Sequence, residues 1–186
     1  MKTIKDSDFY YNLNLIIDWL KNNNIALMET DTVLGLFSKN EEDLYLLKNR
    51  PKEKKIVLLI KNIQQISGDI SDEFTRLANK FWPGKLTIIY HKIAYRIPNH
   101  PQILKILDEL NSIYCTSANI SGHDTIRTSD EAFNIFKDNL ISNKLLVVKG
   151  KSYSTKPSTI YNLDEHKIIR EGEISLNEIN EVLKEM

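Results

Sequence analysis

A run of five aliphatic residues, Ile56–Ile60, constrains the fold of this chain more than any other feature. A short apolar run without alternation is typical of a strand that is buried on both faces, and such strands lie in sheets covered by helices. Helical and strand-like segments alternate irregularly along the rest of the chain, and in places two strand-like segments are adjacent. The pattern predicts an α/β fold with a twisted, mixed and open sheet flanked by helices.

Periodicity and capping signals place the expected elements. Helices are expected over residues 9–20 (with Ser7 or Asp8 as N-cap), 41–47, 74–81 and 103–110, and after the capping boxes Thr128–Glu131 and Ser175–Glu178. Strands are expected at residues 25–28, 56–60, 86–90, 93–97, 112–115, 145–148, 158–161 and 167–169.

Length and charge narrow the function classes. The 186 residues, 41% of them hydrophobic, are enough for one core, so we expect a single domain over residues 1–186. Lys plus Arg equals Asp plus Glu at 25 each, so the overall charge gives no argument for binding nucleic acid or a membrane surface. One Cys excludes an intramolecular disulfide and a multi-Cys zinc site, and the four scattered His predict no metal site.

The sequence gives no sign of membrane insertion or export. No segment approaches the roughly 20 apolar residues of a membrane span, and residues 1–8 lack the apolar run of a signal peptide. We therefore expect a soluble, cytoplasmic protein.

The most unusual polar stretch is Cys115–Gly122, a run of small hydroxyl and amide side chains that follows an apolar strand. Ser, Thr and Asn offer short donors and acceptors, and Gly allows a ligand to approach the backbone. The same residues also favour turns and helix caps, so this stretch alone leaves a binding loop and a turn equally open.

A basic cluster, Lys48–Lys55, places five cations within eight residues at a predicted helix end. The helix macrodipole favours cations at the C-terminal end of any solvent-exposed helix, so the cluster can be explained without a ligand. The alternative is a phosphate-binding group, because Arg supplies a bidentate fork and Lys a mobile point charge.

Three further segments are weaker signals. Residues 30–36 place Thr, Asp and Gly after a buried strand, where ligands often sit in α/β sheets. Trp82–Thr87 is better explained as helix termination with a Trp packed under the turn. Arg96–His100 puts a cation at a strand end, where it can line the same face.

Taken in order, these segments resemble the YrdC/TsaC family of threonylcarbamoyl-AMP synthases. The matching motifs are Thr-Asp-Thr-Val-x-Gly-Leu from Thr30, Lys-x-Arg-Pro from Lys48, Trp-Pro-Gly-x-Leu-Thr from Trp82, Arg-x-Pro-x-His from Arg96, Ser-Ala-Asn-x-Ser-Gly from Ser117, Ser-Thr-Ile from Ser158 and Arg-x-Gly from Arg170. They extend from about Ile25 to Gly172, and their shared order makes the resemblance specific.

The resemblance implies a single YrdC-like α/β domain with a concave, basic cavity. It implies an L-threonylcarbamoyladenylate synthase, which uses L-threonine, bicarbonate and ATP and releases threonylcarbamoyl-AMP and pyrophosphate. The product would pass to a downstream tRNA threonylcarbamoyl transferase complex, which modifies adenosine in tRNA. Mg²⁺ is expected to be carried by the nucleotide, because Mg²⁺ rarely needs a full cage of protein ligands.

The family motifs also imply roles for individual residues. Lys48, Arg50, Ser117 and Asn119 would form the catalytic core. The nucleotide would be bound by Arg50, Lys54, Ser117, Asn119, Thr125 and Arg170, and threonine by Thr32 and Ser158.

The sequence departs from the family pattern at five positions. They are Glu29 and Asp124, where Pro is usual, Leu34, where Tyr is usual, Lys85, where Pro is common, and Leu59, where some members place a threonine-contacting His. The departures leave the core four residues intact and concern the threonine pocket.

Two other functions stay open. A carbamoyltransferase of the HypF kind would use carbamoyl phosphate, but those proteins are much longer and carry Cys pairs that this sequence lacks. A non-catalytic RNA-binding module could use the basic cluster, although the neutral overall charge weakens this alternative.

Overall fold

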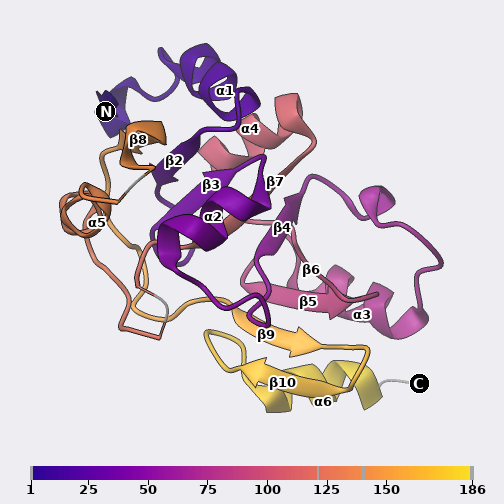
Figure 1. Cartoon of the computed structure of the whole chain (residues 1–186). Coiled ribbons are helices and arrows are strands. Elements are labelled where there is room, and N and C mark those ends of the chain that lie inside the picture. Colours follow the sequence, from indigo (N-terminus) through magenta and orange to yellow (C-terminus); the bar gives the residue numbers. More distant parts are fainter. Residues whose placement is uncertain (1, 121, 140, 185–186) are drawn as a thin grey trace.

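A computed structural model describes residues 2–120, 122–139 and 141–184 of the chain (Figure 1). Ser121 of the predicted polar stretch lies outside the described residues. The α-helices are α1 (Leu13–Lys21), α2 (Glu41–Lys48), α3 (Asp72–Phe81), α4 (Pro101–Leu110), α5 (Ser129–Phe136) and α6 (Leu176–Lys184). The strands are β1 (Lys2–Ile4), β2 (Ile25–Met28), β3 (Gly35–Ser38), β4 (Val57–Ile60), β5 (Leu86–Tyr90), β6 (Ile93–Arg96), β7 (Ser112–Ser117), β8 (Leu145–Val148), β9 (Thr159–Asn162) and β10 (Lys167–Arg170).

The ten described strands form one mixed sheet in the order β1-β8-β2-β3-β7-β4-β6-β5-β9-β10. Parallel pairs (β1–β8, β8–β2, β4–β6 and β5–β9) are interspersed with antiparallel ones. The two chain ends lie near opposite edges of this sheet (Figure 1). The predicted α/β fold with a mixed, open sheet is therefore confirmed.

The helices cover the two halves of the sheet unequally. Around β8, β2, β3 and β7, α1 and α4 cover one face, and α2 and α5 cover the other. Around β6, β5 and β9, α3 and α6 pack on the same face as α2 and α5. Within the described chain, the opposite face of this second half carries no helix, and it is the face that lines the main cavity.

Alternation along the strands determines which side chains face the uncovered side. In β4, Leu58 and Ile60 pack toward α3, whereas Val57 points to the other face and pairs with Ala94 of β6. Ala94 in turn pairs with Ile89 of β5. Because paired residues share a face, a continuous apolar floor forms across these strands.

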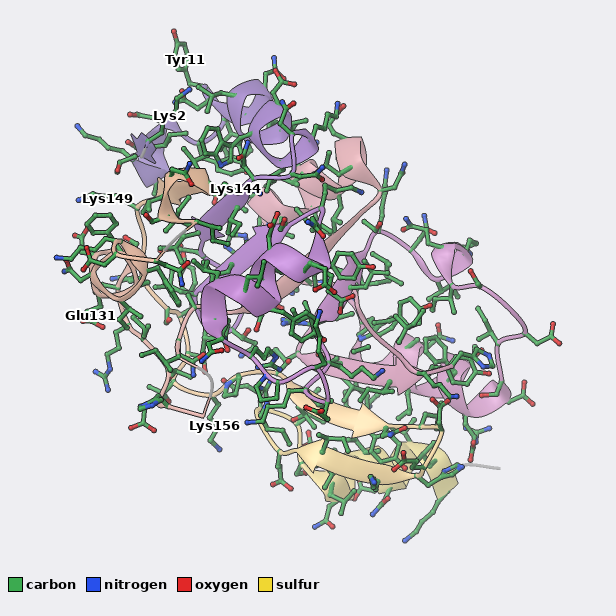
Figure 2. The ribbon with its side chains drawn as sticks, in the orientation of Figure 1. Lys2, Tyr11, Glu131, Lys144, Lys149 and Lys156 are labelled. Atoms are coloured by element: carbon green, nitrogen blue, oxygen red, sulfur yellow. The ribbon has the colours of Figure 1, made fainter. Side chains whose placement is uncertain are left out.

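Two ion pairs hold β8 to the helices beside it. Lys144 and Lys149, which flank β8 (Figure 2), pair with Asp43 of α2 and Asp130 of α5, at 3.2 and 3.1 Å respectively. The Asp43 carboxylate is buried, so its pair contributes more to positioning than the exposed one at Asp130.

The first helix begins later than predicted. The pattern indicated a helix over residues 9–20, but Asp6–Asp8 form a 3₁₀ turn and α1 starts at Leu13 with Asn12 as N-cap. Phe9 is fully buried and holds the chain in turns before the helix begins.

Two strands were not predicted. β1 is only three residues long, too short to show an alternation of apolar and polar residues. The start of β3 was included in the polar segment at residues 30–36, which was interpreted as a loop. β3 forms because its neighbours β2 and β7 pair with it on both sides, which is a tertiary effect that local sequence does not report.

Trp82 packs under the turn after α3, as predicted. Its ring lies edge-on to Phe74 at 5.5 Å, and its indole N–H donates to the carbonyl of Leu86 at 2.6 Å. None of the helices in the described ranges is long and apolar enough to cross a bilayer.

Phe74→Ala should destabilise the protein by about 3–5 kcal/mol, because Phe74 is fully buried between Trp82 and Tyr90 and its loss leaves a cavity. Urea denaturation would measure the change. Leu46→Ala, at a position that is 64% exposed on α2, is the control and should stay within about 0.5 kcal/mol. Equal losses in the two variants would contradict this assignment of the core.

Candidate active site

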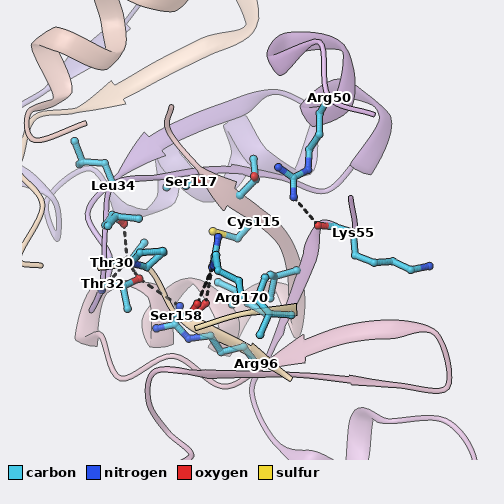
Figure 3. Close-up of a pocket in the computed structure, with 17 residues that line it drawn as sticks. Thr30, Thr32, Leu34, Arg50, Lys55, Arg96, Cys115, Ser117, Ser158 and Arg170 are labelled. Atoms are coloured by element: carbon cyan, nitrogen blue, oxygen red, sulfur yellow. Dashed lines mark hydrogen bonds between the residues drawn. The ribbon is translucent and has the colours of Figure 1, made fainter. Parts of the chain in front are cut away.

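Two adjoining cavities occupy the uncovered face of the sheet. The larger has a volume of about 1040 Å³ and the smaller about 60 Å³. Arg50, Ser117 and Arg170 line both, so the cavities share a wall. Figure 3 shows the smaller cavity with these three residues labelled. A large and a small compartment side by side can hold two different ligands in contact.

Lys48 links the basic segment to the end of β7. The side chain of Asn40 caps the start of α2, and Asn49 in the left-handed conformation (φ 46°) ends the helix directly after Lys48. The Lys48 ammonium donates to the carbonyl of Ser117 at 2.5 Å and lies 3.4 Å from both Ser117 Oγ and Asn119 Oδ1. Two segments about seventy residues apart in sequence therefore meet at one nitrogen.

The β7 end is itself held by hydrogen bonds. Ser117 Oγ donates to Asn119 Oδ1 at 2.5 Å, and Asn119 Nδ2 donates to the carbonyl of His123. The backbone N–H of Ala118 donates to the carbonyl of Leu34. The hydroxyl and amide groups are thus fixed before any ligand arrives, which lowers the cost of binding.

Burial, and then the positive charge of Arg50, lowers the pKa of Lys48 to about 7. The side chain is only 3% exposed. An anion bound beside Lys48 would offset the desolvation and favour the charged amine.

Arg50 and Lys54 lie in the loop that follows α2. The Arg50 guanidinium donates to the carbonyls of Lys54 and Lys55 at 2.9 and 3.0 Å (Figure 3). These bonds fix the loop against the cavity, and the side chain of Lys54 lines the larger compartment. Burial lowers the pKa of Arg50, but an arginine stays charged at neutral pH.

Arg170 and Ser158 contact each other in the wall of the smaller cavity, and Arg170 also lines the larger one. Arg170 donates to the carbonyl of Ser158 at 2.8 and 3.1 Å and approaches Ser158 Oγ at 3.3 Å. Burial, with the charges of Arg50 and Arg96, lowers the pKa of Arg170 to about 10. The guanidinium groups of Arg50 and Arg170 thus lie close enough to attract an anion together.

The smaller cavity is lined by hydroxyl groups and by Arg96, which belongs to a buried ion pair. Arg96 pairs with Asp31 at 2.5 Å, and both side chains are only 8% exposed. Arg96 Nη1 also lies 3.5 Å from Thr32 Oγ1, which in turn is 3.0 Å from Thr30 Oγ1. Hydroxyl groups beside a guanidinium that is already paired suit a small polar molecule.

Cys115 lines the smaller cavity but is a poor nucleophile. Burial raises the pKa of its thiol to about 12. The thiolate is therefore almost absent at neutral pH, and the sulfur acts as a packing group.

The larger cavity is basic. Its walls carry seven Lys and Arg residues against three Asp and Glu: Lys48, Arg50, Lys54, Lys55, Lys92, Lys167 and Arg170 against Glu53, Asp164 and Glu165. In the described ranges no three His, Cys, Asp or Glu side chains are placed to hold a metal ion.

The structure brings all of the sequence-predicted site residues to these cavities. Lys48, Lys54, Asn119 and Thr125 line the larger one, Thr32 and Ser158 the smaller, and Arg50, Ser117 and Arg170 both. Thr125 makes a further bond, from its hydroxyl to the carbonyl of Thr155 at 3.2 Å.

Sequence reasoning missed Asn162 and Pro157. Asn162 reaches the cavity at the end of β9, and Pro157 lies in the segment before that strand. No motif pointed to Pro157, but Asn162 follows the Ser-Thr-Ile motif with the alternation of a strand, which could have indicated its position.

Two of the five departures from the family pattern, Leu34 and Leu59, line the smaller cavity. Glu29 is buried at the end of β2. Lys85 lies farther out and pairs with Glu173 at 3.5 Å, and Asp124 is exposed. The smaller cavity is thus more apolar on one side than the usual residues would make it.

Comparisons with family models and with curated proteins point to one family. The family model Sua5/YciO/YrdC, described as "Telomere recombination", matches residues 18–172. A protein of Methanocaldococcus jannaschii, named putative threonylcarbamoyl-AMP synthase, is 31% identical over 88% of this chain and 89% of its own length. An uncharacterized protein of Mycoplasma pneumoniae is 33% identical over 85% of this chain, and this chain spans about a third of that relative's length.

Solved structures share the fold. Sua5 of Pyrococcus abyssi, solved with L-threonine, superposes with a TM-score of 0.81 at 22% identity, over 100% of this chain and 61% of Sua5. YciO of Escherichia coli superposes with a TM-score of 0.78 at 19% identity, over 96% of this chain and 98% of YciO.

Lys48→Met should stabilise the protein relative to wild type by more at pH 7 than at pH 10. The folded-state pKa of about 7 lies below the ordinary lysine pKa of 10.5, so the unfolded chain binds the proton more tightly between these two pH values. The contribution of Lys48 to stability therefore falls as the pH is lowered from about 10.5 to 7, and a methionine removes that dependence.

Urea denaturation at pH 7, 8.5 and 10 would test this linkage. Lys21→Met, which removes an exposed lysine from the last turn of α1, controls for the change in net charge. A difference between Lys48→Met and wild type that is the same at every pH would show that the amine is not desolvated.

Proposed function

The chain belongs to the Sua5/YciO/YrdC family, and we propose that it is an L-threonylcarbamoyladenylate synthase. The reaction would use L-threonine, bicarbonate and ATP and yield threonylcarbamoyl-AMP and pyrophosphate. The observation that carries the proposal is that Lys48 meets Ser117 and Asn119 in the wall of a large basic cavity, where Ser117 also lines the smaller cavity. Relatives named threonylcarbamoyl-AMP synthase support the same activity.

Threonine would occupy the smaller cavity. The hydroxyls of Thr32 and Ser158 offer partners for its polar groups, and Arg96, whose charge is already paired with Asp31, lies beside them. The binding of L-threonine by Sua5 of Pyrococcus abyssi, which shares this fold, supports the assignment.

ATP would occupy the larger cavity. Lys48, Arg50 and Arg170 would face the phosphates, and Lys54 and Thr125 lie farther along the same compartment. Mg²⁺ would arrive bound to the phosphate oxygens, which are hard ligands of the kind it prefers.

The chemistry requires positioning and charge neutralisation more than acid–base groups. The threonine amine adds to carbon dioxide, derived from bicarbonate, and forms a carbamate. A carbamate oxygen then attacks the α-phosphorus of ATP in line, the bond to the bridging oxygen breaks, and pyrophosphate leaves. Ser117 and Asn119 would hold the carbamate and α-phosphate, and the cations would stabilise the developing negative charge.

The product would be a mixed carbamic–phosphoric anhydride, which is reactive toward an amine. A downstream tRNA threonylcarbamoyl transferase complex would use it to modify adenosine in tRNA. AMP would then leave as the second product of the pathway step.

Arg50→Ala should lower threonine-dependent pyrophosphate release at least tenfold. The variant loses the proposed charge-assisted contact with the ATP phosphates, which is worth roughly 1.5–3 kcal/mol. It also loses the hydrogen bonds that Arg50 donates to the carbonyls of Lys54 and Lys55. Release from ATP plus bicarbonate would be measured with each amino acid in turn. Arg76→Ala, in α3 on the opposite face, is the matched control, and equal rates in the two variants would refute the role of Arg50.

Ser117→Ala should lower the rate of pyrophosphate release while the protein stays folded. Its hydroxyl contacts Lys48 and Asn119 in the shared wall and packs against no core cluster. Circular dichroism during heating would monitor folding in parallel with the rate. A collapsed melting transition would show that the residue has a structural role instead.

The same assay separates the alternative functions. Salt-dependent RNA binding without pyrophosphate release would favour an RNA-binding module. Turnover of carbamoyl phosphate in place of threonine and bicarbonate would favour a carbamoyltransferase.

A further inference from the structure

The segment between β8 and β9, residues 150–157, runs between two polar segments of the site. On one side lies the β2–β3 turn, residues 29–34, which includes Thr32. On the other lies the β7–α5 loop, residues 118–128, which includes Thr125. We call residues 150–157 the strap.

Ser152 of the strap bonds to both neighbours. Its hydroxyl accepts from the backbone N–H of Leu34 at 3.0 Å and donates to the carbonyl of Ile126 at 2.7 Å. Its backbone N–H donates to the carbonyl of Arg127 at 2.8 Å. A single hydroxyl therefore bridges the β2–β3 turn and the β7–α5 loop.

The rest of the strap is held beside this bridge. The backbone N–H of Ser154 donates to the carbonyl of Thr32 at 3.0 Å, and Thr125 donates to the carbonyl of Thr155. The strap then leads into Pro157, which lines both cavities, and into Ser158.

Glu29 fixes the beginning of the strap. Its buried carboxylate accepts a hydrogen bond from the backbone N–H of Lys151. A side chain at Gly150 would collide with Glu29, because a Cβ there would lie 2.4 Å from Glu29 Cγ. The residue that replaces the usual Pro of the family thus holds the strap against the β2–β3 turn.

We propose that Ser152 is a positioning residue, whose bridging hydroxyl fixes the amino-acid side of the site relative to the nucleotide side. It lines neither cavity, so it acts through Thr32 and Thr125. Without the hydroxyl, the N–H of Leu34 loses its acceptor, and the turn and loop are free to separate. The inference rests on the proposed function for the identity of the two ligands.

Ser152→Ala should weaken binding of both L-threonine and ATP by about fivefold, because each net hydrogen bond contributes on the order of 1 kcal/mol. Isothermal calorimetry would measure each affinity with full-length protein. Hydrogen–deuterium exchange should become faster in peptides that cover residues 30–36 and 122–128. Ser152→Thr keeps the hydroxyl and should restore both affinities to within about twofold.

Ser38→Ala is the matched control. Ser38 is fully buried, its hydroxyl accepts from the N–H of Asn40 at 3.1 Å, and it lies at the end of β3 that is remote from the cavities. This variant should lose stability to a similar extent and keep both affinities.

The outcomes separate the two proposals. Unchanged affinities in Ser152→Ala, or a loss equal to that of Ser38→Ala, would overturn the positioning role. Weaker binding without faster exchange in the two peptides would also overturn it. Binding of both ligands by wild type without pyrophosphate release would instead refute the proposed reaction and leave the positioning role to be judged by the affinities.

Discussion

The site depends on the unequal covering of one sheet. Four of the helices sandwich the first half of the sheet, while α3 and α6 pack on one face of the second half. A strand side chain on the remaining face has a neighbouring strand beside it but, in the described chain, no helix above it. The result is a stable floor that is still accessible to a ligand, because the core on the other face provides the packing energy.

Polar groups can be buried at the edge of this floor because they satisfy one another. Lys48 finds oxygen partners at the end of β7, Arg170 finds the carbonyl of Ser158, and Arg96 pairs with Asp31. An unpaired charge at any of these positions would cost several kcal/mol, so each of these groups needs its partners. The cost of holding cations close together would be offset by an anion bound among them.

Local signals predicted most elements correctly for identifiable reasons. Asn40 and Thr128 cap the helices that follow them, since each side chain accepts from a backbone N–H of the first turn. Four residues of the aliphatic run became β4 (Val57–Ile60) near the centre of the sheet, but the strand is not buried on both faces as predicted, because Val57 lines the cavities on the face that carries no helix in the described chain. β1 and β3 were missed because short strands of this kind form only when the neighbours with which they pair are already in place.

The sequence by itself determined most of the helices and strands and the order of the polar motifs, because periodicity and capping depend on residues within one or two turns of each other. The resemblance of the motifs to a family named the candidate site residues, but it did not say how they meet. Only the tertiary structure decided that β4 lies between β7 and β6, that one face of the second half stays uncovered, and that Ser152 bridges two loops. Such contacts join residues separated by 26 to 118 positions, and their formation depends on the packing of the whole core rather than on any local preference.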